Sequence, residues 1–243
     1  MKNREASLLK NKVQDLYSQE GVWRIDESPE YACFHKELEE YKKMAGAEKG
    51  DLYLEIGAGR GRVLTEFTGK YRKLVAIDIS DKMVGSLKDK HYGNLYIIKA
   101  DAENLPFKDS IFDLVLAPAV IGHCADPLKI ALGMKRVMKN NGMGIISTTA
   151  NSLSIPGLFG QIKSFLKHKS FSREFFLLSQ GYCRDSYFFI RKILLEAKLK
   201  IQKVSGTGML PTYLSMRAKK IEKMSSWFPF KFFSRVIIIS FKK

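Results

Sequence analysis

The sequence lacks any long hydrophobic run. Its longest apolar stretches lie at 111–122 and 236–241, well short of the roughly 18 residues that a membrane-spanning helix requires. The first residues, Met1–Glu5, are mostly charged or polar and lack the apolar core of a secretory signal. We therefore expect neither a spanning helix nor export.

Cysteine is also scarce. Cys33, Cys124 and Cys183 are an odd number at irregular spacing, which is typical of reduced thiols and of neither a disulfide framework nor a zinc site. Reduced thiols and the missing export signal together predict a cytoplasmic protein.

Acidic residues are few relative to basic ones. The chain of 243 residues has 41 Lys and Arg against 25 Asp and Glu, a net charge of +16. Much of the excess falls in residues 187–243, which hold 13 Lys and Arg against two Glu, or +11. Such a surface can attract nucleic acid, anionic lipid or an acidic metabolite, and it can equally be a solvated lysine-rich face.

The most informative segment is Leu54–Gly61, Leu-Glu-Ile-Gly-Ala-Gly-Arg-Gly. Glycines allow positive φ and remove the Cβ that would hold a ligand away from the backbone. A dinucleotide fingerprint would place its third glycine where Arg62 stands, and no Gly-Lys-Ser/Thr of a phosphate loop follows. Asp78 nevertheless lies about 20 residues on, where an acid binds ribose. With Glu55 repelling phosphate, the pattern predicts a nucleoside ligand without pyrophosphate.

Strands and helices are predicted to alternate through the centre of the chain. We expect strands near 51–56, 73–77, 95–98, 112–117 and 143–149, and helices near 60–69, 81–89 and 127–139. This rhythm is typical of a parallel sheet with helices on both faces. Glu55, Asp78, Asp101 and Ala117 fall at the carboxyl ends of predicted strands, where such sheets bind ligands.

Five segments together resemble one known family. In chain order they are Glu55–Gly61, Asp78–Ser80, Ala100–Phe107, Ile111–Leu116 continued by His123–Pro127, and Met134–Gly142. They are similar to the motifs of the class I S-adenosylmethionine-dependent methyltransferases. The "His-x-x-Asp-Pro" and the final turn resemble the ubiquinone/menaquinone-biosynthesis-type subfamily, although Asn140-Asn141 replaces its usual Pro-Gly.

The resemblance implies a fold and a donor site. The fold is a Rossmann-like, doubly wound, seven-stranded α/β sheet, mostly parallel with an antiparallel last strand and helices on both faces. Glu55 would hold the donor's amino group, Asp78 its ribose and Asp101 its adenine amine. The full set of expected donor-binding residues is Glu55, Gly57, Ala58, Gly59, Gly61, Asp78, Ile79, Met83, Asp101, Ala102 and Ala117.

His123 is the candidate catalytic base. It follows the fourth strand on the donor side, and a neutral imidazole can deprotonate a hydroxyl near neutral pH. A structural role for this histidine stays open. The segment Ala117-Pro118-Ala119-Val120 stands where an Asn-Pro-Pro-Tyr motif would be, which disfavours methylation of amino groups on bases or protein glutamine.

The flanking regions are expected to add to this core. Residues 1–46 predict two capping helices, in which Tyr17 or Tyr31 contacts ligand or packs in the core. Residues 47–243 are the expected methyltransferase domain, with a lid insertion near 151–186. After it we expect a helix at 187–198 and strands at 200–204 and 235–241.

Residues 211–233 mix aromatics with lysines and arginine. Such a segment either rests on an anionic membrane or packs its aromatics on the sheet. Two activities therefore stay open: methyl transfer to the oxygen or carbon of a small-molecule or lipid-precursor acceptor, and RNA methylation through the basic C-terminal part. RNA is the weaker alternative because the sequence has no RNA-reading aromatic signature. The oligomeric state is not predicted.

Overall fold

The computed structural model describes residues 2–18, 31–46, 49–90, 92–148, 151–154, 158, 162, 166, 183, 185–208, 227 and 229–243. Most of the expected lid insertion 151–186 and of the basic aromatic segment 211–233 lies outside these residues, as does the side chain of Tyr31. The roles predicted for them stay predictions. Within the described part, no helix is both long and apolar enough to cross a bilayer.

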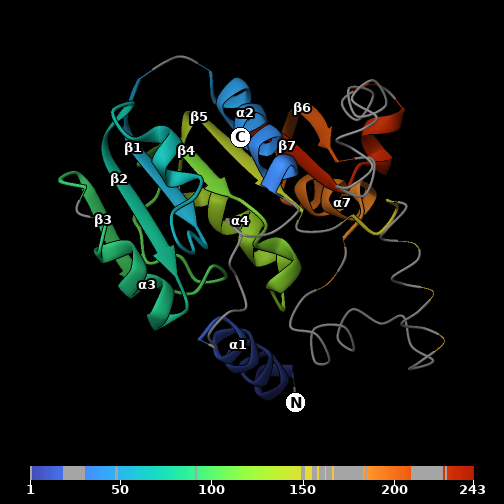
Figure 1. Ribbon diagram of the computed structural model, residues 1–243, viewed down its shortest axis with the longest axis horizontal. Helices are drawn as coiled ribbons and strands as arrows, with labels where there is room; N and C mark the ends of the chain where they lie inside the picture. The colour runs from blue at the N-terminus through green and yellow to red at the C-terminus, as the bar shows by residue number, and fades with distance from the viewer. Residues whose placement is uncertain are drawn as a thin grey trace.

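Seven strands form a single mixed sheet in the order β3-β2-β1-β4-β5-β7-β6 (Figure 1). The strands are β1 Gly50–Ile56, β2 Tyr71–Asp78, β3 Leu95–Lys99, β4 Phe112–Ala117, β5 Met138–Ser147, β6 Lys200–Thr207 and β7 Val236–Lys242. All pairings among β1 to β5 are parallel, whereas β7 runs antiparallel to both β5 and β6. The predicted fold class is thereby confirmed.

The strand order places a ligand-binding crevice at β1 and β4. The chain builds outward from β1 to β3 and then returns to add β4 on the other side of β1. Loops leaving β1 and β4 therefore diverge toward opposite faces of the sheet, and the space between them is where open α/β sheets bind ligands.

Alternating side chains of the strands form two cores, one on each face. Leu54 and Ile56 pack on the face covered by helices α4 (Pro127–Val137) and α7 (Tyr187–Glu196). Tyr53 packs on the other face, beneath α2 (Tyr31–Ala45) and the short 3-10 helix η2 (Leu64–Phe67). Helix α3 (Asp81–Lys88) contributes Leu87 to this second core.

Helix α1 (Lys2–Ser18) lies apart from both cores, at the edge of the sheet toward which the parallel strands point (Figure 1). The remaining short 3-10 helices are η3 (Ile121–His123) and η5 (Phe230–Phe233). Two helices do form within residues 1–46, as the sequence predicts, but α1 covers the carboxyl ends of the strands while α2 covers a face of the sheet.

Two predicted boundaries are wrong. The helix expected at 60–69 is only the 3-10 helix η2, because Gly61 and Gly69, within the expected range, have positive φ, which a right-handed helix excludes. The fifth strand begins at Met138, before the expected 143, because Met138 pairs with Phe112 ahead of a bulge. Pairing resumes at Met143 opposite Leu114.

A substitution at Gly144 of β5 can test how closely β5 packs against its antiparallel neighbour β7. A Cβ at this position would lie 2.1 Å from the ring of Phe241, which is fully buried and has no room to move. We expect Gly144→Ala to lower the free energy of unfolding by about 1–3 kcal/mol, measured by urea titration. Gly85→Ala in α3 is the matched control. Its Cβ meets open space, so it should stabilise by about 0.5–1 kcal/mol. Equal destabilisation by both variants would contradict the packing argument.

Candidate active site

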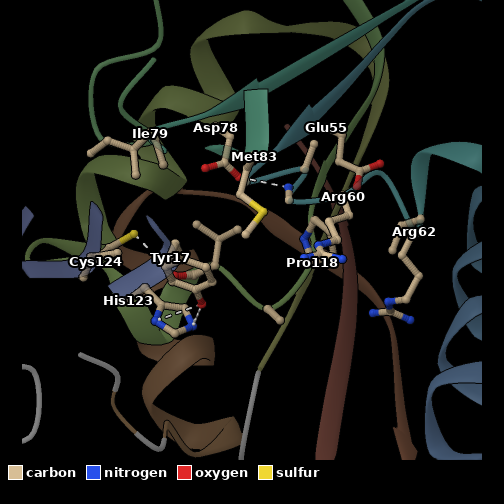
Figure 2. Close-up of a pocket in the computed structure, with 18 of the residues that line it drawn as sticks. Tyr17, Glu55, Arg60, Arg62, Asp78, Ile79, Met83, Pro118, His123 and Cys124 are labelled. Atoms are coloured by element: carbon tan, nitrogen blue, oxygen red, sulfur yellow. Dashed lines mark hydrogen bonds between the residues drawn. The ribbon is translucent and has the colours of Figure 1, made fainter. Parts of the chain in front are cut away.

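A cavity of about 640 Å³ opens at the carboxyl ends of the parallel strands (Figure 2). Its walls come from α1, α2, the loops that follow β1 to β4, and the start of β7. Ten of the sequence-predicted residues line it: Glu55, Gly57, Ala58, Gly59, Asp78, Ile79, Met83, Asp101, Ala102 and His123. The structure therefore brings together residues that are up to 68 positions apart in the chain (123 − 55).

Gly61 and Ala117 are not among the described residues that line this cavity. A Cβ on Gly61 would lie 2.8 Å from Leu87 of α3, so its glycine allows the loop to pack against that helix. Ala117 is fully buried in the core on the α4 face. Their expected contact with a donor stays a prediction.

The glycine loop leaves its backbone open to the cavity. Gly57 has φ +66° and passes so near Val120 that a Cβ would lie 2.3 Å from its Cγ2. Gly59 has φ +53°, and a Cβ there would meet no atom within 4 Å. At Gly57 only glycine fits the wall, and at Gly59 the main chain faces open space that a ligand can fill.

Asp78 is held by the backbone on both carboxylate oxygens. The N–H of Gly59 donates to Oδ2 and the N–H of Ser80 donates to Oδ1, each at 2.9 Å. Burial raises the pKa of Asp78, while these backbone hydrogen bonds partly oppose the rise. A carboxylate so fixed keeps acceptor positions for a pair of neighbouring hydroxyls.

Glu55 is almost fully buried beneath the glycine loop. The hydroxyl of Tyr53 donates to its Oε2 at 2.5 Å. Burial raises the pKa of Glu55 to about 8, against the opposing influence of Tyr53 and of the nearby Arg62 guanidinium. The carboxyl is therefore close to its titration point at neutral pH and would ionise beside a bound cation.

Arg62, which argued against a dinucleotide motif in the sequence, has a defined partner in the structure. Its Nη2 lies 3.0 Å from Oε2 of Glu37, a buried residue of α2. Tyr41 donates to Glu37 and bonds to Ser147 at 2.6 Å, and Ser147 accepts the N–H of Ala119 at 3.0 Å. This network joins α2, the glycine loop and the loop after β4 around the cavity. The sequence does not show which acid pairs with Arg62.

Arg60 points into the cavity from the same loop (Figure 2). No ion pair or hydrogen bond of its guanidinium is found among the described residues. It therefore presents an available positive charge to a ligand.

Helix α1 is joined to the site by Lys10. Its Nζ lies 2.6 Å from Oδ2 of Asp101 and 3.2 Å from Glu103. Burial would raise the pKa of Asp101, but its hydrogen bond to Lys10 and those from Glu103 and Asn104 hold it below the usual value. Glu103 in turn accepts the N–H groups of Ala125 and Asp126 and so fixes the loop beyond His123.

A second contact of α1 pairs Tyr17 with His123. The phenol oxygen lies 2.8 Å from Nε2 and 3.5 Å from Nδ1 of the imidazole, and the rings are edge to face. Tyr17 also lines the cavity. The sequence left its role open between core packing and ligand contact. Lys10, Val13 and Tyr17 recur at helical spacing and all line the cavity, so this face of α1 could have been identified from the sequence once its position was known.

Comparison with known proteins agrees with this geometry. Residues 54–146 match a family model described as a methyltransferase domain. The chain is 32% identical over 123 residues to a malonyl-[acyl-carrier protein] O-methyltransferase of Marinomonas sp. (strain MWYL1), covering 49% of this chain and 46% of the relative. It is 30% identical over 106 residues to a ubiquinone/menaquinone biosynthesis C-methyltransferase of Vibrio vulnificus, covering 40% and 41%. The chain thus spans less than half the length of these curated relatives.

Solved structures share the fold over nearly the whole chain. The N-methyltransferase NodS of Bradyrhizobium japonicum WM9, solved with S-adenosyl-L-homocysteine, aligns with a TM-score of 0.64 at 14% identity and covers 97% of this chain and 98% of its own. An S-adenosylmethionine-dependent methyltransferase of Mesorhizobium loti aligns with a TM-score of 0.63 at 13% identity, covering 90% and 100%.

Three findings converge: the ordered motifs, the strand order with its antiparallel β7, and the matched family model. The cofactor of this family is S-adenosylmethionine, and the open backbone at Gly59 beside the fixed Asp78 carboxylate fits it. Residues 54–146 therefore match a methyltransferase domain, and the chain has the Rossmann-like fold of solved methyltransferases.

Proposed function

We propose that this protein transfers a methyl group from S-adenosylmethionine to an oxygen or carbon atom of a small-molecule or lipid-precursor acceptor. The observation that carries the proposal is the Asp78 carboxylate, fixed by Gly59 and Ser80 next to open glycine backbone. The two relatives named for O-methylation of a malonyl carrier and for C-methylation in quinone biosynthesis support an acceptor of this kind.

Each part of the donor has a counterpart in the cavity. Asp78 accepts from the ribose hydroxyls, and Asp101 with the backbone of Ala102 binds the adenine edge. Asp101 keeps an acceptor position for this contact. Lys10 and Asn104 donate to its Oδ2, and among the described residues Oδ1 accepts from the N–H of Glu103 alone. Glu55 lies where it can ionise against the ammonium group, and Arg60 can pair with the carboxylate.

The bound donor supplies an electrophilic methyl group on a positively charged sulfur. The protein's main task is to align an acceptor atom with that methyl, because in-line displacement depends on orientation. His123 lines the cavity and is available as a base when the acceptor is a hydroxyl. An acceptor that is already nucleophilic requires alignment alone.

The alternative of RNA methylation rests on the basic residues 187–243, of which 209–226 and 228 lie outside the described part. Neither of the curated relatives reported above is named for RNA methylation.

The proposed membrane contact of residues 211–233 also depends largely on residues outside the described part, 211–226 and 228. Charge reversal at Lys219, Lys220 and Lys223 followed by binding to anionic vesicles would test it, and unchanged binding would exclude it.

Calorimetric titration with S-adenosylmethionine and with NAD tests the donor assignment. We expect binding of S-adenosylmethionine and no binding of NAD.

Asp78→Ala should weaken S-adenosylmethionine binding at least about 100-fold, since two charge-assisted hydrogen bonds to ribose are lost. Asp81→Ala is the matched control, because Asp81 pairs with Lys99 outside the cavity and its loss should leave affinity unchanged. NAD binding, or full affinity in a folded Asp78→Ala protein, would contradict the proposal.

The raised pKa of Glu55 predicts a proton-linked affinity. In the free protein the carboxyl is largely protonated below its pKa of about 8, and a bound ammonium group stabilises the ionised form. Binding between pH 6 and 7.5 should therefore release a proton, and affinity should increase with pH over this range. Calorimetry in two buffers of different ionisation enthalpy measures the release. Glu55→Gln should abolish it, and equal apparent enthalpies for the wild type in both buffers would refute the assignment.

A further inference from the structure

We propose that Tyr17 is a catalytic residue that carries the proton of an acceptor hydroxyl to His123. This inference rests on the proposed function, which makes His123 the base for an O-directed methyl transfer. It adds that the base acts through a phenol brought from helix α1, so that the active site is complete only with α1 in place.

The contact between the two side chains is close. The Tyr17 oxygen is 2.8 Å from Nε2 of His123 and 3.5 Å from Nδ1, so Nε2 is its hydrogen-bond partner. Figure 2 shows the phenol oxygen directed at the imidazole ring, on the side of the cavity that also holds Cys124. The Tyr17 hydroxyl therefore contacts the His123 imidazole, and Tyr17 itself lines the cavity.

The surroundings of Tyr17 keep its hydroxyl protonated. Burial raises the pKa of the phenol well above its usual value, and the nearby Asp78 carboxylate raises it further. A free tyrosinate is therefore excluded as a resting base. Proton transfer through Tyr17 must be concerted, with the phenol giving up one proton as it receives another.

Helix α1 is fixed to place Tyr17 at this point. Lys10 lies seven residues earlier, two turns along the same face of the helix, and forms ion pairs with Asp101 and Glu103. Because Glu103 also holds the N–H groups of Ala125 and Asp126, the ion pairs position α1 against the loop that carries His123. The two contacts therefore set the register of α1 over the cavity.

The proton balance of the step is complete without another reactant. The acceptor oxygen forms a bond to the methyl carbon as the carbon–sulfur bond breaks, and the sulfur keeps that electron pair. The acceptor's proton passes to the Tyr17 oxygen while the Tyr17 proton passes to Nε2 of His123. The products are a neutral ether or ester, a neutral thioether, the phenol and an imidazolium ion.

Tyr17→Phe tests the relay because it removes only the hydroxyl and keeps the ring that packs edge to face on His123. With an O-acceptor found by screening, we expect kcat to fall about 100-fold or more while the affinity for S-adenosylmethionine stays within twofold. His123→Asn should cause a similar loss, and the double variant little more, since the two residues act as one unit. Tyr96→Phe, on the exposed face of edge strand β3, is the matched control and should retain full kcat. Wild-type kcat in Tyr17→Phe would overturn the relay.

A spectroscopic readout requires no acceptor. In full-length protein labelled with ¹⁵N-histidine, the wild-type Nε2 signal of His123 should show the hydrogen bond to the Tyr17 hydroxyl. Tyr17→Phe should shift this signal, and Tyr96→Phe should not. Unchanged His123 signals in Tyr17→Phe would overturn the inference. Absence of turnover by the wild type with every acceptor would instead overturn the proposed function, so the two failures are distinguishable.

Discussion

The site depends on the hydrogen bond from the Gly59 N–H to Asp78. It links the loop leaving β1 to the end of β2, in a turn where Gly57, Gly59 and Gly61 take positive φ values. The positive φ of Gly61 also excludes a helix from the start of the range 60–69. One glycine-rich turn thus leaves open backbone beside Asp78 and shortens the helix that follows.

Around this link, buried charge is arranged in pairs and networks. Arg62 with Glu37, and Lys10 with Asp101 and Glu103, each connect an N-terminal helix to a loop at the carboxyl ends of the strands. Burying these ions has a desolvation cost that close pairing offsets, so their value lies in fixing which helix faces which loop. Glu55 is instead held by the Tyr53 hydroxyl, and burial raises its pKa to about 8 despite the nearby Arg62 guanidinium.

Two sides of the cavity differ in the chemical groups that line them. Backbone and carboxylates from the loops after β1, β2 and β3 form the side that we propose for the nucleoside and amino-acid parts of the donor. Tyr17, His123 and Cys124 form the side where proton transfer can occur. The first side comes from loops of the sheet, whereas the second depends on Tyr17 of α1.

The sequence by itself determined the fold class and the seven strands near their observed positions, because strand alternation is a local signal. Glycine spacing and acids at strand ends also indicated residues that come together in one cavity, and their binding roles stay predictions. It could not show that Gly61 and Ala117 lie outside the described cavity lining while their neighbours lie within it, since both types of position favour small residues. Only the tertiary structure decided the partners of Lys10, Tyr17 and Arg62. These pairs join residues 25 to 106 positions apart, and spacing along a chain carries no information about contacts made at such separations.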